Sequence, residues 1–540
     1  MRTSRTVILS ALMAALCTAC WLGWNRYLGA GRDDVFLTLW SGECLAAGKG
    51  LINHNGVAVE ISSSILHTWV VAALAWADIM PLFLANKLFG LLALLGTLVF
   101  MAIACSRSLH SSNSDVTGTL FVLATVSTTP SLLYWSMGGL ETSIAVFLWT
   151  ALPLTLAHVE RESARNLAAS VLGVLLVLVR PEGYLILSLI MILVTAAQRG
   201  TPYSRLLIRP WIVWSGVFFA VSTWRLSSFG SIWPNPVLAK AAPSLESLSR
   251  GLRYALGFYT SSALVFALGV AFGVRLVMLV RARTRDYRST VLVSTLLALH
   301  LFVITTGGDW MEHHRFLQPA LPLLTLSLAD QLDEVLPSRS RFARLGIASS
   351  LLILVLLNLG QRSAVDSGTW TMESTARAGL VDADDLDSRA KLSNSVYARD
   401  AADLFPFFEE HLLGLEGSTE EPLVLATPQM GQLPYFLRSR FPEVTLELVD
   451  TRGLCEPDLA ALDVARGAFG LEAGADLAGI LGGAYGPLSD AVRARRPNLL
   501  YRVREPDEGI RKLEELGFEL VHRSDRAMVF FRSEPWPDQE

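Results

Sequence analysis

The sequence predicts an α-helical polytopic membrane protein that ends in a soluble α/β domain, and three observations support this fold class. Of the 540 residues, 52% are hydrophobic and only 17% are charged, which is more apolar surface than a soluble chain of this length can bury. Apolar runs of membrane length recur as far as Leu359. The segment from Gln361 to Glu540 is instead rich in Asp and Glu and contains no spanning run.

The apolar runs indicate about eleven membrane-spanning helices, each needing roughly 17–25 residues once its interfacial ends are counted. Their apolar cores are Val7–Trp24, Leu84–Ala104, Val116–Leu133, Thr142–Leu156, Leu167–Leu178, Tyr184–Val194, Trp211–Val221, Phe258–Val280, Val291–Ile304, Phe316–Leu328 and Leu345–Leu359. The first run follows a basic start that is similar to a signal peptide, but we interpret it as an uncleaved helix. Ile61–Ala77 is also apolar, yet a crossing there would reverse every later loop, so we expect an interfacial or partly re-entrant helix.

The loops between these runs fall into two classes by charge. One class is rich in arginine and is therefore expected in the cytoplasm together with the N-terminus. It contains Arg2, Arg5, Arg107, Arg161, Arg165, Arg199, Arg205, Arg209, Arg281, Arg283, Arg285, Arg288, Arg339, Arg341 and Arg344. The other class carries the polar motifs, which are expected on the outer face of the plasma (inner) membrane. We predict a transmembrane domain over 1–362, with a first external loop at 25–83, and an extracytoplasmic α/β domain over 363–540.

Short apolar segments predict the elements of the C-terminal domain. The expected elements are strands at Leu423–Ala426 and Val444–Val449, a turn into a helix at Met430–Phe436, a helix at Ile510–Leu516 and a hairpin at Glu519–His522 and Ala527–Arg532. The five cysteines have no metal-site spacing. A disulfide between Cys44 and Cys455 outside the cell is an open alternative that nothing in the sequence requires.

Ionisable residues gather at the outer ends of the predicted spans, where they are candidates for function because burying them unpaired is costly. They are Asp33, Asp34, Glu141, Arg180, Glu182, Lys240, Asp309, Glu312, His313, His314 and Arg315. Asp33 and Asp34 begin a short amphipathic helix, and helix capping is the alternative role of this pair. The alternatives for the others are a cap (Glu141), an interfacial ion pair (Arg180 and Glu182), a snorkelling side chain (Lys240) and solvated loop residues (His313 and His314).

Carboxylates and cations above a lipid-accessible wall suit the transfer of a group from a lipid phosphate to a hydroxyl. A carboxylate can accept the proton of the attacking hydroxyl, and cations offset the charge that develops on the departing phosphate. A single in-line displacement would invert the anomeric centre. The sequence contains no phosphate-binding loop, nucleophile elbow or sign of nucleic-acid binding. It requires no cofactor, although paired aspartates could recruit Mg²⁺ or Mn²⁺.

An ordered set of motifs carries a family resemblance. The set comprises Asp33–Thr38, Gly48–Asn53, Glu60, Ser62–Ser64, Trp135–Thr142, Arg180–Gly183, Pro234–Asn235 with Lys240, Gly307–Phe316, Gly431–Tyr435 and Asp450–Leu454. In this order the motifs resemble GT-C fold glycosyltransferases, and in particular the mycobacterial terminal arabinofuranosyltransferase-like (AftB-like) group. The resemblance covers most of the chain. Val35–Phe36 and Ser62–His67 depart from that group's pattern, which leaves the identity of the sugar open.

The resemblance implies an inverting glycosyltransferase of the outer membrane face. It would move a sugar, such as a pentofuranose, from a polyprenyl phosphate to a cell-envelope polysaccharide or glycolipid. By this resemblance Asp33 or Asp34 is the general base, with Asp33 favoured. Lys240 and Arg315, assisted by His313 or His314, would hold the donor phosphate. The sugar or acceptor pocket would be lined by Glu141, Arg180, Glu182, Asp309 and Asn235.

Two other function classes remain open at this stage. One is a lipid-linked-sugar transporter or a non-catalytic envelope glycan-assembly factor, and the other is a degenerate GT-C scaffold that only binds glycan. A transporter is expected to have inverted repeats, broken helices and polar groups near the middle of the bilayer. The polar groups predicted here lie at one membrane face instead, which favours the enzyme.

Overall fold

The computed structural model describes residues 2–28, 30–108, 115–240, 245–282, 286–309, 311–335, 349–350, 352–357, 396–418, 421–428, 430–460, 477–502, 507–523 and 528–536. The chain divides into two compact units. We call the first, which comprises Met1–Ala30, Ala85–Val221 and Pro243–Thr369, the helical unit. We call the second, which comprises Gly31–Leu84, Ser222–Ala242 and Trp370–Glu540, the α/β unit. Each is described by itself.

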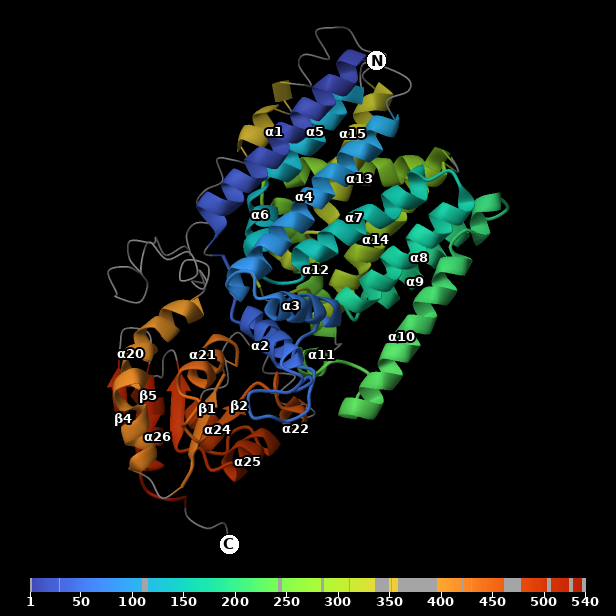
Figure 1. Cartoon of the computed structure of the whole chain (residues 1–540). Coiled ribbons are helices and arrows are strands. Elements are labelled where there is room, and N and C mark those ends of the chain that lie inside the picture. The colour runs from blue at the N-terminus through green and yellow to red at the C-terminus, as the bar shows by residue number, and fades with distance from the viewer. Residues whose placement is uncertain are drawn as a thin grey trace. The chain divides into compact units, whose positions relative to one another are not determined.

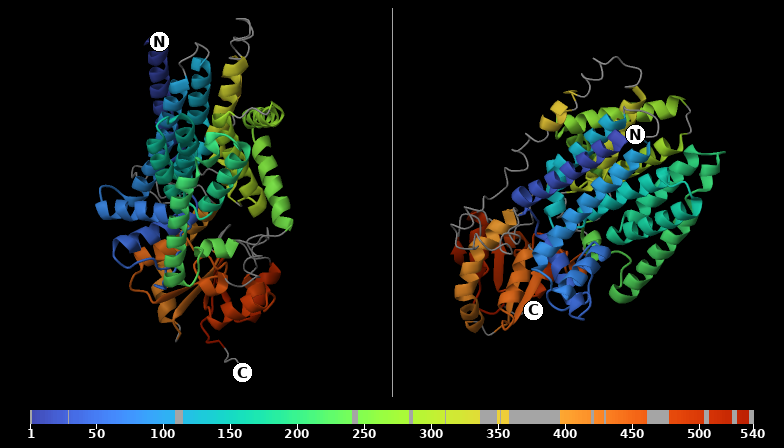
Figure 2. Two further views of the ribbon diagram at one scale, coloured as in Figure 1. Left: turned by 90° about the vertical axis from the view of Figure 1, so that its right-hand side faces the viewer. Right: turned by 45° about the horizontal axis from the view of Figure 1, so that its top comes forward.

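The helical unit contains most of the long helices, which run alongside one another in all views (Figure 1 and Figure 2). Its helices, two of which extend into the α/β unit, are α1 (Arg2–Tyr27), α4 (Leu82–Ser108), α5 (Asp115–Thr128), α6 (Pro130–Met137), α7 (Thr142–His158), α8 (Glu162–Val179), α9 (Gly183–Ala197), α10 (Ile208–Phe229), α12 (Leu245–Thr260), α13 (Ala263–Ala282), α14 (Tyr287–Thr306) and α15 (Ala320–Val335), with 3₁₀ turns η1 (Pro202–Arg205) and η2 (Glu312–Leu317). Most of the expected apolar cores up to Leu328 lie within these helices.

Within the described residues, five helices are long and apolar enough to cross a membrane, and a bent pair would make a sixth. The five are Thr6–Tyr27, Leu82–Cys105, Glu162–Val179, Ala263–Arg281 and Tyr287–Thr306. Shorter apolar helices occupy Ile65–Ala77, Thr142–His158, Gly183–Ala197 and Ala320–Leu332. The protein is therefore a multi-pass membrane protein. The count is lower than the expected eleven because several expected cores form helices too short to meet this length. The core Leu345–Leu359 lies partly outside the described residues.

Two expected cores are broken where the chain offers a new helix start. Val116–Leu133 bends by 51° between α5 and α6, because Pro130 at the first position of α6 has no N–H to continue the preceding helix. The expectation of one helix over Phe258–Val280 is wrong. Helix α12 ends at Thr260 and α13 begins at Ala263, and the Ser262 hydroxyl accepts the Val265 N–H at 3.0 Å as an N-cap.

The α/β unit is built on a five-stranded sheet in the order β2-β1-β3-β5-β4. Its strands are β1 (Leu423–Thr427), β2 (Leu446–Asp450), β3 (Leu499–Arg502), β4 (Glu519–Arg523) and β5 (Met528–Phe531). Strands β2 and β3 lie parallel to β1 on either side, whereas β5 is antiparallel to both β3 and β4. The predicted strands and the C-terminal hairpin are confirmed. The helices are α20 (Val396–Gly417), α21 (Gln432–Arg440), α22 (Pro457–Ala460), α24 (Leu477–Leu481), α25 (Pro487–Ala494) and α26 (Asp507–Glu515).

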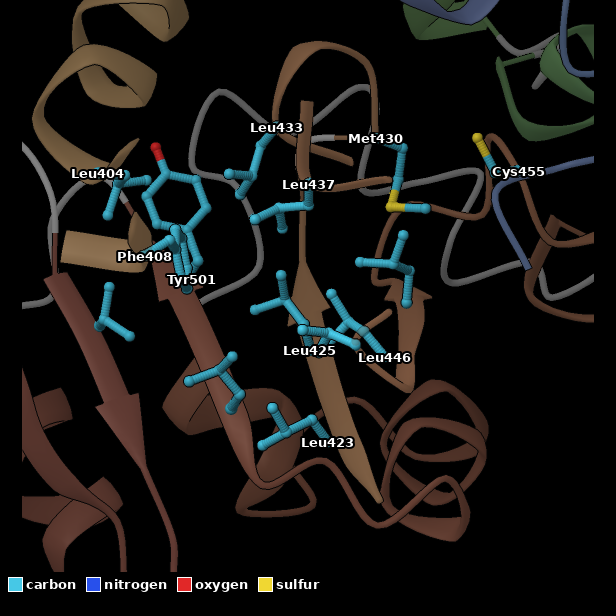
Figure 3. Close-up of a cluster of buried hydrophobic side chains, with 14 of the residues drawn as sticks. Leu404, Phe408, Leu423, Leu425, Met430, Leu433, Leu437, Leu446, Cys455 and Tyr501 are labelled. Carbon is cyan, nitrogen blue, oxygen red and sulfur yellow. The ribbon is translucent and has the colours of Figure 1, made fainter. Parts of the chain in front are cut away.

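The predicted first loop is part of the α/β unit rather than an appendage of the transmembrane domain. It contributes α2 (Asp34–Ala46) and α3 (Ile65–Ala77), and the segment after α10 contributes α11 (Asn235–Lys240). Leu37, Val59, Ile61 and Ala239 are buried in the same core as side chains of β1, β2, α20 and α21. Figure 3 shows the centre of this core. Burying each large side chain stabilises the unit by about 1.5–3 kcal/mol. Because this core joins the first loop to the C-terminal segment, a domain boundary based on sequence position alone separates residues that pack together.

Helix α3 packs closely on α2, because a Cβ at Gly42 would lie only 2.4 Å from Val71. Its opposite side exposes Trp69 and Trp76, and its interfacial position remains a prediction. Cys44 and Cys455 are free, buried thiols. The open alternative of a disulfide between them is therefore wrong in this structure, where Cys455 is part of the apolar core.

Candidate active site

The predicted site residues fall into two groups, one in each unit. Asp33, Asp34, Asn235 and Lys240 belong to the α/β unit, whereas Glu141, Arg180, Glu182, Asp309, His313, His314 and Arg315 belong to the helical unit. Within each unit the structure brings residues together that are far apart in the sequence. The two groups are described separately below.

Asp33 lies directly before α2, but its side chain makes no capping bond to that helix. Instead, its two carboxylate oxygens accept the backbone N–H groups of Gly431 at 3.0 Å and Gln432 at 2.7 Å. These N–H groups are at the start of α21. The prediction that Asp33 caps α2 is thus wrong. The Asp33 side chain instead caps α21, whose Gly431 lies 398 residues further along the chain.

The environment of Asp33 is closed. The residue is 9% exposed, and burial raises its pKa to about 6, with the neighbouring Asp34 adding to the rise and the two N–H donors opposing it. A Cβ at Gly431 would lie 2.0 Å from the backbone oxygen of Asp33. Only glycine therefore permits this close approach of the first loop to the start of α21.

Asp34 and Lys240 form a more accessible pair. The Lys240 Nζ lies 3.3 Å from Asp34 Oδ2, and the two side chains are 29% and 17% exposed. Lys240 is the last residue of the short helix α11, and Asp34 is the first residue of α2. The sequence analysis favoured Asp33 over Asp34 as the base and assigned Lys240 to the donor phosphate, whereas the structure pairs Lys240 with Asp34.

Asn235 anchors α11 at its other end. Its Nδ2 donates to the carbonyl oxygens of Gly453 and Leu454, both at 2.8 Å, and its backbone N–H donates to the backbone oxygen of Glu60 at 3.1 Å. Asn235 is 4% exposed. The side-chain N–H groups of Asn235 thus bind the C-terminal domain. Its placement in a sugar or acceptor pocket stays a prediction.

The sequence analysis missed the partner of Glu60. The Arg225 guanidinium, near the end of α10, contacts both Glu60 oxygens at 2.6 and 2.8 Å in a buried bidentate pair. Burial raises the pKa of Glu60, and Arg225 opposes the rise. The only sequence signal was an arginine inside an apolar helix, which requires a partner when it is buried. Since Glu60 also accepts the Asn235 N–H, this pair stabilises the segment that ends at Lys240.

The loop after β2 supplies the surface on which Asn235 docks. The Asp450 carboxylate accepts the N–H groups of Arg452 at 2.9 Å and Cys455 at 2.7 Å, and Glu456 accepts the Asp450 N–H at 2.7 Å. Burial raises the pKa of Asp450 to about 6 and that of Glu456 to about 7. The positive charge of Arg452 acts in the opposite direction on both Asp450 and Asp33.

In the helical unit, Arg180 joins two carboxylates. Its Nη1 donates to Glu141, and its Nε donates to Glu182 at 2.6 Å. All three side chains are at most 15% exposed, and the guanidinium lies 4.6 Å from the ring centroid of Phe316. Glu141 makes no capping bond to α7, so its alternative interpretation as a cap is wrong. The ion-pair alternative for Arg180 and Glu182 is confirmed.

Arg315 also has a buried partner. Its Nε contacts Asp309 Oδ2 at 2.6 Å, and the side chains are only 8% and 4% exposed. The guanidinium lies 5.8 Å from the Trp135 ring and 5.1 Å from the Phe316 ring. This cation is neutralised and enclosed by aromatic rings in the structure. A contact between Arg315 and a donor phosphate would require the guanidinium to bind the phosphate and Asp309 at the same time.

His313 and His314 both have left-handed backbone conformations, with φ of 57° and 52°. Two successive non-glycine residues in this region are strained, and such strain occurs preferentially at functional sites. The Gln318 side chain donates to the carbonyl oxygens of both histidines, and the rings pack on Tyr134 and Tyr254. Burial lowers the pKa of His314. They are not the solvated loop residues of the alternative interpretation.

A second residue that the sequence analysis missed is Lys87, inside α4. It is 2% exposed, and its Nζ donates to the carbonyl oxygens of Ala30 and, at 2.9 Å, of Met137. The adjacent Asn86 donates to Gly139 at 2.8 Å. A lysine inside an apolar run was a usable signal, since such residues inside membrane spans are functional candidates.

Among the residues that the structure describes, no three His, Cys, Asp or Glu side chains are grouped so that they could hold a metal ion. The alternative of a Mg²⁺ or Mn²⁺ ion at the paired aspartates would therefore need ligands besides the protein's carboxylates. Whether catalysis needs a metal stays a prediction.

No protein-family model and no curated protein sequence matches this chain. Two solved structures of ArnT from Cupriavidus metallidurans are similar along nearly the whole chain. The ArnT structure bound to undecaprenyl phosphate is 14% identical, with a TM-score of 0.50, and the match covers 98% of this chain and 97% of that one. The apo structure is 15% identical, with a TM-score of 0.51 and coverage of 97% and 98%.

The oligosaccharyltransferase AglB from Archaeoglobus fulgidus, solved with an inhibitory peptide and a dolichol-phosphate, is 11% identical with a TM-score of 0.49. It covers 92% of this chain and 69% of that one. At such sequence identities a structural likeness concerns the fold alone. The fold of this chain is therefore assigned from the two ArnT structures, whose TM-scores are 0.50 and 0.51. Membrane helices in one unit and a small sheet in the other, together with the ArnT likeness, show that this chain has the GT-C glycosyltransferase fold.

Proposed function

We propose that this protein is an inverting glycosyltransferase that uses a polyprenyl-phosphate-linked sugar. The acceptor is a cell-envelope polysaccharide or glycolipid on the outer face of the plasma membrane, and a pentofuranose is the sugar to test first among the donors. The GT-C fold supports an enzyme of this class. The observation that carries the proposal is the Asp34–Lys240 pair, in which a carboxylate and an ammonium lie 3.3 Å apart and are both partly exposed.

The chemistry needs only these groups and the substrates. A first-loop aspartate accepts the proton of the acceptor hydroxyl while the hydroxyl oxygen attacks the anomeric carbon. The bond from that carbon to the phosphate oxygen breaks, and polyprenyl phosphate leaves with the electron pair. Lys240 offsets the charge on the departing phosphate. One displacement inverts the anomeric centre, and no redox partner is required.

In the helical unit, we propose Arg315, His313 and His314 as contacts of the donor phosphate. Glu141, Arg180, Glu182 and Asp309 then contact sugar or acceptor. The support for these roles is the concentration of charged and strained residues around the Phe316 ring, where a buried cation has little other use. The pairs of the helical unit differ from Asp34–Lys240 in being more deeply buried, with side chains at most 15% exposed.

The decisive experiment incubates purified full-length protein with a panel of polyprenyl-phosphate sugars and a soluble acceptor analogue. Release of polyprenyl phosphate with one sugar supports the enzyme. The matched variant D33N/D34N should lose release while still binding the donor lipid. A transporter or glycan-binding factor would release no polyprenyl phosphate and would be indifferent to the double variant.

The predicted orientation has its own test in a cysteine-free background. A single cysteine at exposed Ser418 should react with a membrane-impermeant reagent in intact cells, whereas one at exposed Arg161 should react only after permeabilisation. If the cysteine at position 161 reacts in intact cells and the one at position 418 only after permeabilisation, the proposed reaction on the outer face is contradicted.

A further inference from the structure

The sheet of the α/β unit has a feature typical of ligand-binding α/β domains. Strand β1 lies between β2 and β3, both parallel to it. The chain therefore leaves β1 toward one side and later returns on the other. In open α/β sheets, ligands bind beyond the carboxyl ends of the strands at such a switch point, and anions bind at the N–H groups of the following helix.

In this protein the corresponding helix start is occupied by the chain itself. The helix after β1 is α21, and its first N–H groups bind the two Asp33 oxygens. Because Gly431 has no Cβ, the backbone of Asp33 can also approach closely. The carboxylate of the first loop thus takes the position of an anionic ligand.

Further side chains of the same loop bind backbone groups at this end of the sheet. Asn53 donates to the Cys455 carbonyl oxygen at 3.0 Å, and the His54 Nε2 lies 2.9 Å from that of Met430. Asn55 both donates to the Leu448 oxygen at 2.7 Å and accepts the Leu448 N–H at 3.0 Å. It therefore pairs with the edge strand β2 as a neighbouring strand would.

We infer that Asp33 is a positioning residue that holds the first loop on the strand-end edge of the C-terminal domain, and that Asp34 is the general base. The inference rests on the proposed function. Both Asp33 oxygens are already hydrogen-bonded and buried, so proton uptake from a substrate would break bonds that hold the loop. Asp34, the next residue, is held by Asp33 at the start of α2, where its carboxylate faces Lys240.

Four single variants separate the two roles. Asn at position 33 keeps one acceptor oxygen for the Gln432 N–H, whereas Ala keeps none and leaves two backbone N–H groups without an acceptor. We therefore expect D33N to lower kcat by about tenfold and D33A by about 100-fold or more. At position 34 neither variant retains a base, so D34N and D34A should both fall to the background rate.

The pH profile gives a readout that loop positioning does not change. The acid limb of kcat/KM should persist in D33N, because it reports the base at position 34. The proposal is overturned if D33N is as inactive as D33A, or if D33N loses the acid limb.

A second measurement does not depend on activity. Hydrogen exchange of the full-length protein in detergent should show peptides containing the Gly431 and Gln432 amides protected in the wild type and exchanging faster in D33A. G431A, which pushes the loop away, should resemble D33A. G414A is the matched control, because a Cβ at Gly414 on α20 meets no atom within 4 Å.

The two measurements distinguish the possible failures. If the wild type releases no polyprenyl phosphate with any donor, the proposed function fails. Hydrogen exchange of the Gly431 and Gln432 amides in D33A then still shows whether Asp33 holds the first loop. Unchanged exchange in D33A and G431A would overturn the positioning role even in an active enzyme.

Discussion

The acid–cation pairs of the two units differ in how far they are closed. In the helical unit, the Asp309–Arg315 contact is 2.6 Å long and its side chains are at most 8% exposed. In the α/β unit, the Asp34–Lys240 contact is 3.3 Å long with side chains up to 29% exposed. Breaking a buried pair leaves an uncompensated charge and is costly, whereas a partly exposed pair exchanges its partner at little cost. The Asp34–Lys240 pair of the α/β unit is therefore the one that can exchange its partner at the lower cost.

The largest expected effect tests the closed pair. R315Q should lower the free energy of unfolding by about 3–5 kcal/mol, because Asp309 is left buried without its cation. Thermal or chemical unfolding in detergent measures it. R440Q is the control, since Arg440 pairs with Glu409 on the surface and should change stability by less than about 1 kcal/mol. If R315Q is as stable as the wild type but inactive, the structural role of Arg315 is contradicted, and Arg315 would act only as a substrate ligand.

The next effect tests the open pair. K240Q should lower kcat/KM for polyprenyl phosphate release by about 10²–10³-fold, because a positive group near the departing phosphate is lost. Its unfolding free energy should change by less than about 1 kcal/mol. Comparison of K240Q with R315Q by the same two assays sharpens the contrast between the units. Equal losses of stability in both variants would contradict it.

A third effect concerns the buried Glu456 carboxyl in the loop after β2. Burial raises the pKa of Glu456 from 4.5 to about 7, so the folded state binds a proton more tightly than the unfolded state. The contribution of Glu456 to stability is therefore fully present below about pH 4.5 and is lost as the pH rises through about 7. E456Q keeps the acceptor for the Asp450 N–H and should flatten this fall by about 2 kcal/mol. Denaturant unfolding of both proteins across this pH range is the measurement, and parallel curves would refute the assignment.

The smallest expected effect concerns metals. In the proposed mechanism Asp34 and Lys240 supply both base and cation, so removing divalent ions with EDTA should change the rate of polyprenyl phosphate release by less than about twofold. Adding Mg²⁺ or Mn²⁺ back is the control. A strong loss that either ion restores would show that the paired aspartates act with a metal.

Part of this organisation was predictable from local patterns. The apolar runs located most helices of the membrane domain, and short apolar segments located β1, β2 and the hairpin of β4 and β5. Glu141, Arg180 and Glu182 were recognised as candidates because charged residues stand out at membrane edges, and the structure joins them. The grouping of Asp34 with Lys240, across 206 residues, followed from an ordered family resemblance and not from periodicity.

The sequence by itself determined where most of the helices and strands lie and that buried charges need partners, because hydropathy, periodicity and the cost of burying charge act over short distances along the chain. Only the tertiary structure decided which partners they have. Asp33 binds the start of α21 across 398 residues, and Glu60 pairs with Arg225 across 165 residues. Such choices depend on how whole elements pack in space, and no local pattern in the sequence records that packing.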